Sequence, residues 1–276
     1  MIKYHIRKIA IATNFSEESD NAVYQAAEIA KKHNAELDII HAVSPAESRN
    51  KKAEFVQAAY DRLKMYRDRI LNEFDIESKV FARVGDVAAF IYKYCIENKT
   101  DLLIIGVLNG VKRYFKESMA YEIIMKIECP VLSIPLSFKK ADFYKILFPV
   151  RDVEGVKEKL VHSQPFIQKD NSELHIVCLG QPDSYKVNEV IELAQNQQIQ
   201  FSISDFDADS KKNIAPGVIL AAKERQADMI VINATSEKQW YNIFGENYTE
   251  YILKEAAMAV LSITHPFESA NLSDIK

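Results

Sequence analysis

The chain repeats its own pattern of strands once, and this repeat constrains the fold more than any other feature. The apolar segment at residues 8–13 (KIAIAT) returns 137 positions later at residues 145–150 (KILFPV). Residues 36–43 (ELDIIHAV) return at the same interval at residues 173–180 (ELHIVCLG). Because two separate segments recur at one interval, the sequence indicates that a single structural unit has been duplicated.

The second copy is shorter than the first. Residues 101–105 (DLLII) recur 127 positions later as DMIVI, and residues 131–134 (VLSI) recur 129 positions later. The number of positions between matching segments is therefore about ten smaller for the later two pairs of segments than for the earlier two. We place the missing residues between 180 and 222, where residues 182–197 stand in place of a longer helix of the first copy.

Strand and helix patterns alternate through the first copy. Short apolar runs read as strands, and segments with apolar residues at helical spacing lie between them. The expected strands are residues 8–13, 36–43, 78–84 and 101–105, and the expected helices are residues 17–33, 51–74 and 86–98. Alternation of this kind predicts a parallel sheet with helices on both faces. Right-handed crossovers make a doubly wound sheet the leading topology.

Length and composition favour two α/β domains. The chain has 276 residues, of which 48% are hydrophobic and 27% charged, so each half can bury a core of its own. A polar and aromatic segment at residues 136–144 (LSFKKADFY) separates the two copies. We expect domains at residues 1–137 and 143–266.

Charge and cysteine content exclude several classes of protein. The net charge of −4 gives no general attraction to nucleic acid or to membranes. The apolar run near the N-terminus is too short for a signal peptide, and no apolar segment approaches the ~20 residues of a spanning helix. Cys95, Cys129 and Cys178 are far apart in the sequence and form no CxxC pair, so we expect buried thiols with a packing role in a reducing cytoplasm.

Two short motifs carry a resemblance to a known family. The first strand runs into Thr-Asn-Phe-Ser at residues 13–16, and the last strand of the first copy is reached through Glu-Cys-Pro-Val-Leu-Ser-Ile-Pro at residues 128–135. Within a tandem α/β chain, these motifs resemble the universal stress protein family, over nearly the whole chain and once per half. The resemblance implies two five-stranded parallel sheets of order 3-2-1-4-5. It also implies a pseudo-dimer in which residues 131–135 pair with residues 260–264.

The resemblance also implies where a ligand would bind. ATP-binding members place an Asp at the end of strand 1 and a G-x2-G-x9-G-[ST] motif after strand 4, because glycines let backbone N–H groups approach phosphate. The matching nucleotide-binding candidates are Thr13, Asn14, Gly106, Gly110 and Ser118.

This first-half motif departs from the family pattern. Asn14 replaces the Asp, Gly110 comes one place late, and Glu117 replaces the closing Gly. Lys112, Arg113 and Lys116 either offset that added negative charge or are simply solvated. We therefore expect weak ATP binding or none.

The second half departs further from the pattern. Arg151 stands in place of the Asp, Asn233 and Ser236 in place of the first two glycines, and Glu246-Asn247 in place of the closing pair. We read the aromatic residues of this loop as packing or interface residues rather than as a platform for adenine; they are Trp240, Tyr241 and Phe244. No nucleotide is expected here.

Other polar residues each have a structural and a functional interpretation. His41, near the end of the second strand, is either a hydrogen-bonded core residue or a contact for adenine. Asp101 and Asp228 are carboxylates of the kind that catalytic sites use, but each comes just before the fourth strand of its copy. They therefore lie at the edge of the sheet opposite the ligand crevice, which argues against a catalytic role. Turn capping is the role we expect for both.

No catalytic constellation is visible in the sequence. The chain has no GxxxxGK[ST], GxGxxG, GxSxG or HExxH motif, and its six histidines are scattered. We expect a non-enzymatic protein of the general stress response, with no cofactor and no metal ligand. Its expected partners are the pairing of its own domains, a second copy of the chain, or an unknown protein, with no nucleic acid and no membrane. The alternatives are a switch or slow ATPase that binds ATP in its N-terminal domain only, and a module that regulates a partner.

Overall fold

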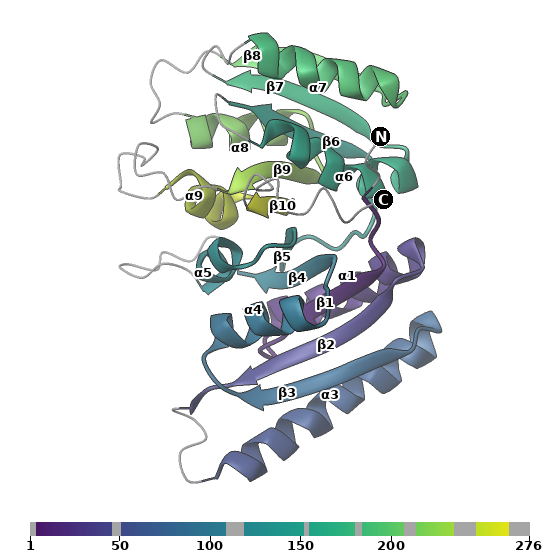
Figure 1. Cartoon of the computed structure of the whole chain (residues 1–276), viewed down its shortest axis with the longest axis vertical. Helices are drawn as coiled ribbons and strands as arrows, with labels where there is room; N and C mark the ends of the chain where they lie inside the picture. The colour runs from purple at the N-terminus through teal and green to yellow at the C-terminus, as the bar shows by residue number, and fades with distance from the viewer. Residues whose placement is uncertain are drawn as a thin grey trace. The chain divides into compact units, whose positions relative to one another are not determined.

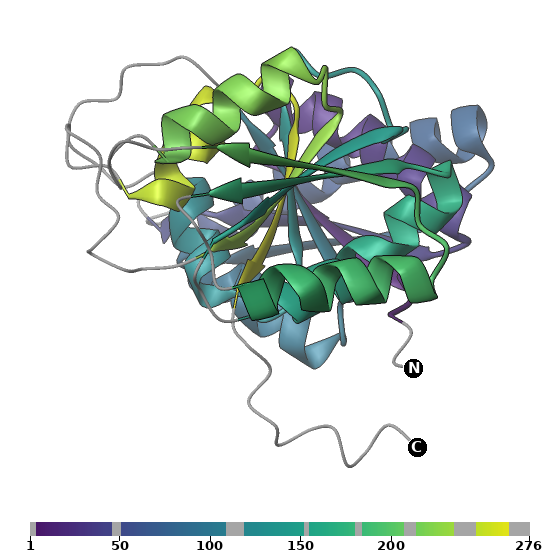
Figure 2. The ribbon, with the colours of Figure 1, turned by 90° about the horizontal axis from the view of Figure 1, so that it is seen from above.

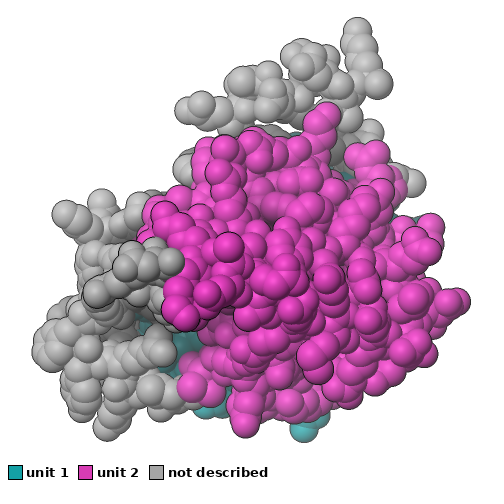
Figure 3. Space-filling view, turned by 90° about the horizontal axis from the view of Figure 1, so that it is seen from below, with its two compact units in different colours: residues 1–4, 142–276 teal, residues 5–141 magenta. Residues whose placement is uncertain are grey.

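The chain folds into two compact units. The computed structural model describes residues 4–45, 51–108, 119–151, 155–179, 184–206, 214–234 and 247–264. The N-terminal unit comprises residues 5–141, and the C-terminal unit comprises residues 142–276 together with 1–4 (Figure 3).

The N-terminal unit is a parallel sheet in which strand and helix alternate (Figure 1). Its strand order is β3-β2-β1-β4-β5, which confirms the expected doubly wound topology. The strands are β1 (Lys8–Ala12), β2 (Glu36–Val43), β3 (Ser78–Val84), β4 (Leu102–Val107) and β5 (Val131–Pro135). The helices are α1 (Glu17–His33), α3 (Lys52–Phe74), α4 (Val87–Glu97) and α5 (Met119–Lys126).

The C-terminal unit repeats this topology. Its strand order is β8-β7-β6-β9-β10, with β6 in the place of β1. The strands are β6 (Lys145–Val150), β7 (Glu173–Leu179), β8 (Phe201–Phe206), β9 (Met229–Ala234) and β10 (Ala259–Thr264). The helices are α6 (Val156–Asp170), α7 (Ser184–Asn196), α8 (Ile214–Glu224) and α9 (Tyr248–Glu255). Helix α7 has 13 residues where α3 has 23. This difference accounts for the smaller spacing between the matching segments that follow these helices.

Helices cover both faces of each sheet. In the N-terminal unit α1 packs with α3, and α4 packs with α5; in the C-terminal unit α6 packs with α7, and α8 with α9. Figure 2 shows α8 and α9 on one side of their strands and α6 and α7 on the other. Strands sandwiched in this way are buried on both faces, which is why they read as continuous apolar runs such as LLII in β4. No helix among the described residues has both the length and the apolar character needed to cross a membrane.

The apolar residues that recur at helical spacing along α3 are not all buried. Ala59, Leu63 and Ile70 are buried, but Val56, Tyr66 and Phe74 are only half-buried. Helix α3 covers β2 and the edge strand β3, so it has less sheet to pack against than α1 has over β1 and β4. The spacing of apolar residues in a sequence predicts which face of a helix points inward. It does not predict how much of that face the neighbouring elements cover.

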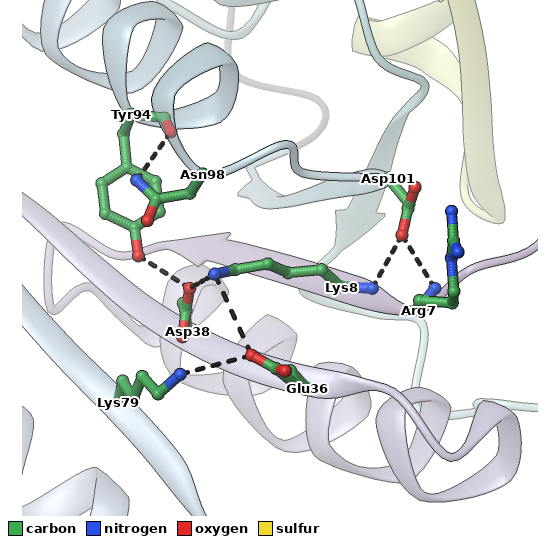
Figure 4. A network of polar contacts seen from close by, with 8 residues as sticks. All are labelled: Arg7, Lys8, Glu36, Asp38, Lys79, Tyr94, Asn98 and Asp101. Carbon is green, nitrogen blue, oxygen red and sulfur yellow. Dashed lines mark hydrogen bonds and ion pairs between the residues drawn. The ribbon is translucent and has the colours of Figure 1, made fainter. Parts of the chain in front are cut away.

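Asp101 and Asp228 fasten the first strand of each unit to the fourth. The carboxylate of Asp101 accepts hydrogen bonds from the backbone N–H groups of Arg7 and Lys8, both at 2.9 Å (Figure 4). Asp228 accepts one from the N–H of Lys145 at 3.1 Å. Both residues lie at the amino-terminal edge of their sheet, as expected, and the groups that they cap are backbone N–H groups at the start of strand 1 rather than those of their own turn.

A second polar cluster lies at the same edge of the N-terminal unit. Asp38 on β2 is almost fully buried, and its carboxylate lies 3.0 Å from the Lys8 ammonium and accepts a hydrogen bond of 2.7 Å from the Tyr94 hydroxyl (Figure 4). Burial, and then this hydrogen bond, raises the pKa of Tyr94. In the second copy, 137 positions later, His175 stands in the place of Asp38, and it hydrogen-bonds Ser202 and Ser204 instead. The two copies have kept a polar group at this position and changed its chemistry.

We predict that Asp101→Ala lowers the free energy of unfolding of the N-terminal unit by about 1–3 kcal/mol, because it removes the acceptor from two backbone N–H groups. Urea unfolding measures the change. Asp61→Ala is the control, since Asp61 lies on the exposed face of α3 and pairs with Lys64 in solvent. Equal effects of the two substitutions would contradict the capping role.

Candidate functional site

The candidate site lies at the carboxyl ends of β1 and β4. In a doubly wound sheet the strand order reverses there, and the diverging loops leave a crevice for ligands. In the N-terminal unit this edge carries residues 13–16 after β1, His41 near the end of β2, and Gly106 in β4.

Thr13 is buried, and its hydroxyl and carbonyl groups are hydrogen-bonded within the protein. It is 5% exposed, and its hydroxyl bonds the hydroxyl of Ser19 at 3.0 Å and accepts the N–H of Phe15 at 3.0 Å. Its carbonyl accepts the Nδ1–H of His41 at 2.8 Å. His41 is thus hydrogen-bonded, as the structural interpretation expects, but it is only half-buried and is not a core residue. Thr13 serves to shape the turn.

Asn14 is exposed and engaged in a local turn. Its side-chain oxygen accepts the N–H of Ser16 at 3.1 Å and the hydroxyl of Ser16 at 2.6 Å. Ser16 in turn caps the start of α1 by accepting the N–H of Ser19. Asn and Asp make this kind of turn equally well, so the contact explains why an Asn is stable here. It leaves the position without the negative charge that a carboxylate would bring.

Phe15 anchors an aromatic cluster that the sequence did not predict. Its backbone is in the left-handed region, with φ 62°, which is uncommon for a bulky residue. Its ring centroid lies 4.4 Å from that of His41 and 6.0 Å from that of Tyr66, and the guanidinium of Arg62 lies 4.0 Å above its face. Arg62 and Tyr66 come from α3, four residues apart and so on one side of the helix.

Tyr66 connects this cluster to helix α1. Its hydroxyl donates to the carboxylate of Asp20, and burial followed by this hydrogen bond raises the pKa of Tyr66. The aromatic cluster therefore fixes α3 over the turn that follows β1. A flat, partly apolar surface with a cation above it is also a surface on which a planar ring can stack.

Gly106 is required by helix packing. A Cβ atom at this position would lie 2.7 Å from the Cα of Ser19 and closer still to the carbonyl group of Glu18. The backbone of α1 thus occupies the space that a side chain would need. The glycine that matched the family's phosphate motif has a complete structural explanation without a ligand. The other two candidates, Gly110 and Ser118, lie outside the described residues, as do Glu117 and the basic residues Lys112, Arg113 and Lys116.

The corresponding edge of the C-terminal unit holds two buried basic side chains. Arg151, directly after β6, is 3% exposed, and its guanidinium lies 3.8 Å above the ring of Tyr248. Lys159 on α6 is 1% exposed; its amine donates to the carbonyl of Pro149 and lies 4.0 Å from the ring centroid of Phe148. Burial, and then the nearby charge of Arg151, lowers the pKa of Lys159 well below its ordinary value.

The strand register explains why a lysine is placed there. Residues Ile9–Ala12 of β1 all pair with β4, whereas β6 pairs with β9 only at Ile146 and Leu147. Beyond Leu147 the carbonyl of Pro149 takes its hydrogen bond from the amine of Lys159. The interval of 137 aligns Lys159 with Ala22 of the buried stripe of α1, and that exchange of an alanine for a lysine was the sequence signal for it.

Two further candidates of the C-terminal unit have structural roles. Asn233 donates from its side chain to the carbonyl of Gly155 at 2.8 Å, and Asn247 caps α9 by accepting the N–H of Glu250 at 2.8 Å. The remaining candidates lie outside the described residues: Ser236, Trp240, Tyr241, Phe244 and Glu246. Within the described part of the chain, no group of three or more His, Cys, Asp or Glu side chains is placed to hold a metal ion.

Comparison with known proteins identifies the fold. Residues 5–135 match the model of the universal stress protein family. The N-terminal half of the chain is a universal stress protein domain. The whole chain fits a tandem form of the family, in which the C-terminal unit repeats the same fold. A search of curated proteins gave no match.

Solved structures of similar length share this architecture. A universal stress protein from Archaeoglobus fulgidus superposes with a TM-score of 0.78 at 14% identity, covering 95% of this chain and 100% of that one. A functionally unknown protein from Pseudomonas aeruginosa superposes with a TM-score of 0.61 at 14% identity, covering 94% and 92%. At this identity the likeness establishes the fold.

We predict that Gly106→Ala destabilises the N-terminal unit by about 1–3 kcal/mol, because the added methyl group must displace the backbone of α1. Gly85→Ala is the matched control, since a Cβ at residue 85 meets no atom within 4 Å and the substitution should be neutral or slightly stabilising. Thermal unfolding of both variants measures the difference. An unchanged Gly106→Ala variant would contradict the packing role.

We predict that Lys159→Met changes how stability depends on pH. With its pKa lowered in the folded state, Lys159 is neutral when folded and protonated when unfolded across the range between its two pKa values. The unfolded wild type therefore binds the extra proton there, and wild-type stability rises with pH by up to about 1.4 kcal/mol per unit relative to the variant.

Urea unfolding at pH 7, 8 and 9 measures this slope. Lys157→Met on the exposed side of the same helix is the control and should follow the wild type. Parallel pH profiles for wild type and Lys159→Met would show that the buried amine is charged in the folded protein.

Proposed function

We propose that the chain is a non-enzymatic tandem universal stress protein that acts in the general stress response from the cytoplasm. The family match of residues 5–135 supports the family part of this proposal. The geometry of the two crevices supports the non-enzymatic part. At the position where ATP-binding members of the family carry an Asp, the first strand of the N-terminal unit leads into Asn14 and that of the C-terminal unit leads into Arg151.

A single observation carries the proposal most directly. At the N-terminal crevice, both motif residues that the structure describes in full are used by the protein itself: Asn14 closes a turn with Ser16, and Gly106 makes room for the backbone of α1. Asn14 departs from the family motif, and the packing of α1 explains why Gly106 agrees with it, so neither residue provides evidence for phosphate binding. A degenerate nucleotide site is expected to lose the residues that bind the ligand and to keep those that the fold itself requires.

The C-terminal crevice supports the same conclusion by a different route. Lys159 and Arg151 occupy the interior next to the end of β6, and Asn233 closes onto the turn before α6. Each of these side chains is therefore engaged by the protein itself near the end of β6. We propose that this unit serves a structural or partner-binding role.

We further propose that the two units are domains of residues 1–137 and 143–266, which pair as a pseudo-dimer through β5 and β10. The apolar sequences of these strands, VLSIP and AVLSIT, support the pairing, because an uncovered apolar edge strand invites aggregation. The partners we propose are the chain's own domains, a second copy, or another protein.

The second candidate function is a nucleotide-dependent switch or slow ATPase that uses the N-terminal unit alone. The aromatic cluster favours it, because Phe15, His41 and the exposed Arg62 offer a stacking surface and a cation at the crevice. An exposed Asn14 is also free to turn toward a ligand at the cost of two hydrogen bonds to Ser16.

Isothermal titration of the full chain with ATP and Mg²⁺ separates the two functions. We predict no binding tighter than a Kd of about 100 μM, which corresponds to roughly 5.5 kcal/mol. Tighter binding that is lost in Gly110→Glu and kept in Gly85→Glu would establish the switch instead. The control adds the same charge to the turn after β3, where a side chain meets no neighbour.

Hydrogen exchange of the intact protein tests the domain pairing. We predict that the backbone amides of β5 and β10 are protected as strongly as those of β4 and β9, because paired strands have partners on both sides. The outer strands β3 and β8 provide the reference for an open edge. Exchange in β5 and β10 as fast as in β3 and β8 would exclude the pairing.

A further inference from the structure

A histidine and two serines meet on neighbouring strands of the C-terminal sheet. His175 lies on β7 and is 6% exposed, while Ser202 and Ser204 lie on β8, the last strand in the sheet order, and are half-buried. The Nδ1 atom of His175 lies 2.6 Å from the hydroxyl oxygen of Ser202, and its Nε2 atom lies 3.1 Å from that of Ser204. Both ring nitrogens are therefore hydrogen-bonded to hydroxyl groups.

The register of β7 and β8 explains this cluster. His175 pairs directly with Ser202, and Ser204 follows two residues later on β8. Side chains two residues apart in a strand point to the same face of the sheet, so one histidine ring can reach both serines. The cluster therefore depends on the pairing of two strands that are distant in the sequence, and none of its residues belongs to the candidate crevice at the end of β6.

The matching positions of the N-terminal unit carry different side chains. Asp38 stands in the place of His175, and the register of β2 with β3 places Lys79 and Phe81 where β8 has its two serines. The pairing of an imidazole with hydroxyl groups at this position is thus specific to the C-terminal copy.

Glu173 determines which ring nitrogen of the histidine carries the proton. The hydroxyl of Ser202 donates to the carboxylate of Glu173 at 3.4 Å, and an ionised carboxylate can only accept. Because a serine hydroxyl has one hydrogen, Ser202 accepts the hydrogen bond from the Nδ1–H of His175. The Nε2 atom then has the lone pair, and the hydroxyl of Ser204 donates to it.

His175 is in the form that accepts a proton. Burial, and then the nearby charge of Arg225, lowers the pKa of His175, and Glu173 raises it by less. The imidazole is therefore neutral at pH 7. A serine hydroxyl that donates to a neutral imidazole, whose other nitrogen is held by a third group, is the arrangement that activates a serine as a nucleophile.

We propose that Ser204 accepts an acyl group from an activated carboxylic ester, with His175 as the general base and Ser202 as the positioning residue. The acceptor is the protein itself, so the reaction is a modification of the chain and requires no turnover. It goes beyond the function proposed above, because it uses neither crevice.

The reaction balances without a redox partner. The Oγ of Ser204 attacks the carbonyl carbon of the ester while the Nε2 of His175 takes the hydroxyl proton. The tetrahedral intermediate then breaks its bond to the oxygen of the leaving group. His175 gives its proton to that oxygen, or to solvent where the leaving group is a stable phenolate. One acyl serine and one alcohol or phenolate form.

Reaction of the full chain with p-nitrophenyl acetate tests the proposal. The absorbance of p-nitrophenolate measures acyl transfer, which we expect to be slower by about tenfold or more in Ser204→Ala and in His175→Gln, because each removes the activated pair. Trypsin places Ser204 in residues 187–211. After a brief reaction and an acid quench, fragmentation of this peptide from the wild type should locate an acetyl group on Ser204.

Two variants of Ser202 separate positioning from folding. Ser202→Ala removes the hydroxyl that holds the imidazole and should slow the transfer, whereas Ser202→Thr keeps a hydroxyl there and should restore most of the wild-type rate. Circular dichroism and thermal unfolding establish which variants are folded. The wild-type peptide map stands even if a variant fails to fold.

The outcomes are distinct. A wild-type rate equal to that of Ser204→Ala, with acetyl groups on lysine or tyrosine side chains only, would overturn the proposal and leave the cluster a structural one. Acetylation of Ser202 in place of Ser204 would also overturn it. Release of more than one phenolate per chain that depends on Ser204 and His175 would support the acylation and contradict the non-enzymatic function proposed above.

Discussion

The close approach of helix α1 to strand β4 is the constraint on which the N-terminal unit depends. The helix backbone at Glu18 and Ser19 leaves no room for a side chain at residue 106. This contact sets the position of the start of α1, and Ser19 then ties the helix to Thr13. The turn after β1 is completed by Asn14 and covered by the ring of Phe15. The geometry of the crevice therefore follows from packing, and a glycine can persist in β4 whether or not a phosphate binds there.

The duplicated unit shows how the same frame accommodates different chemistry. The aspartate that fastens strand 4 to strand 1 is kept as Asp101 and Asp228. Elsewhere the copies differ: Lys159 occupies the position of Ala22, and its amine satisfies a carbonyl that the shortened β6–β9 ladder leaves open. One aspartate contact that holds each sheet together is therefore shared by the two copies, while the side chains after strand 1 differ between them.

Local pattern and repetition predicted the fold almost completely, because strands, helices and the capping aspartates depend on residues close in sequence or on topology. The candidate site was predicted less well. Phe15, Arg62 and Tyr66 come from two elements, and only the packing of α3 over the first turn brings them together. Gly106 matches the family motif, but a backbone contact also explains this glycine, so the sequence match alone does not distinguish a phosphate site from helix packing.

We propose above that this universal stress protein architecture no longer binds a nucleotide. Mass spectrometry of the small molecules released on denaturing freshly purified protein tests this loss, since a ligand bound in the cell survives purification when it binds tightly. We expect no adenine nucleotide above trace amounts. Release of ATP or another nucleotide at close to one per chain would contradict the loss of nucleotide binding.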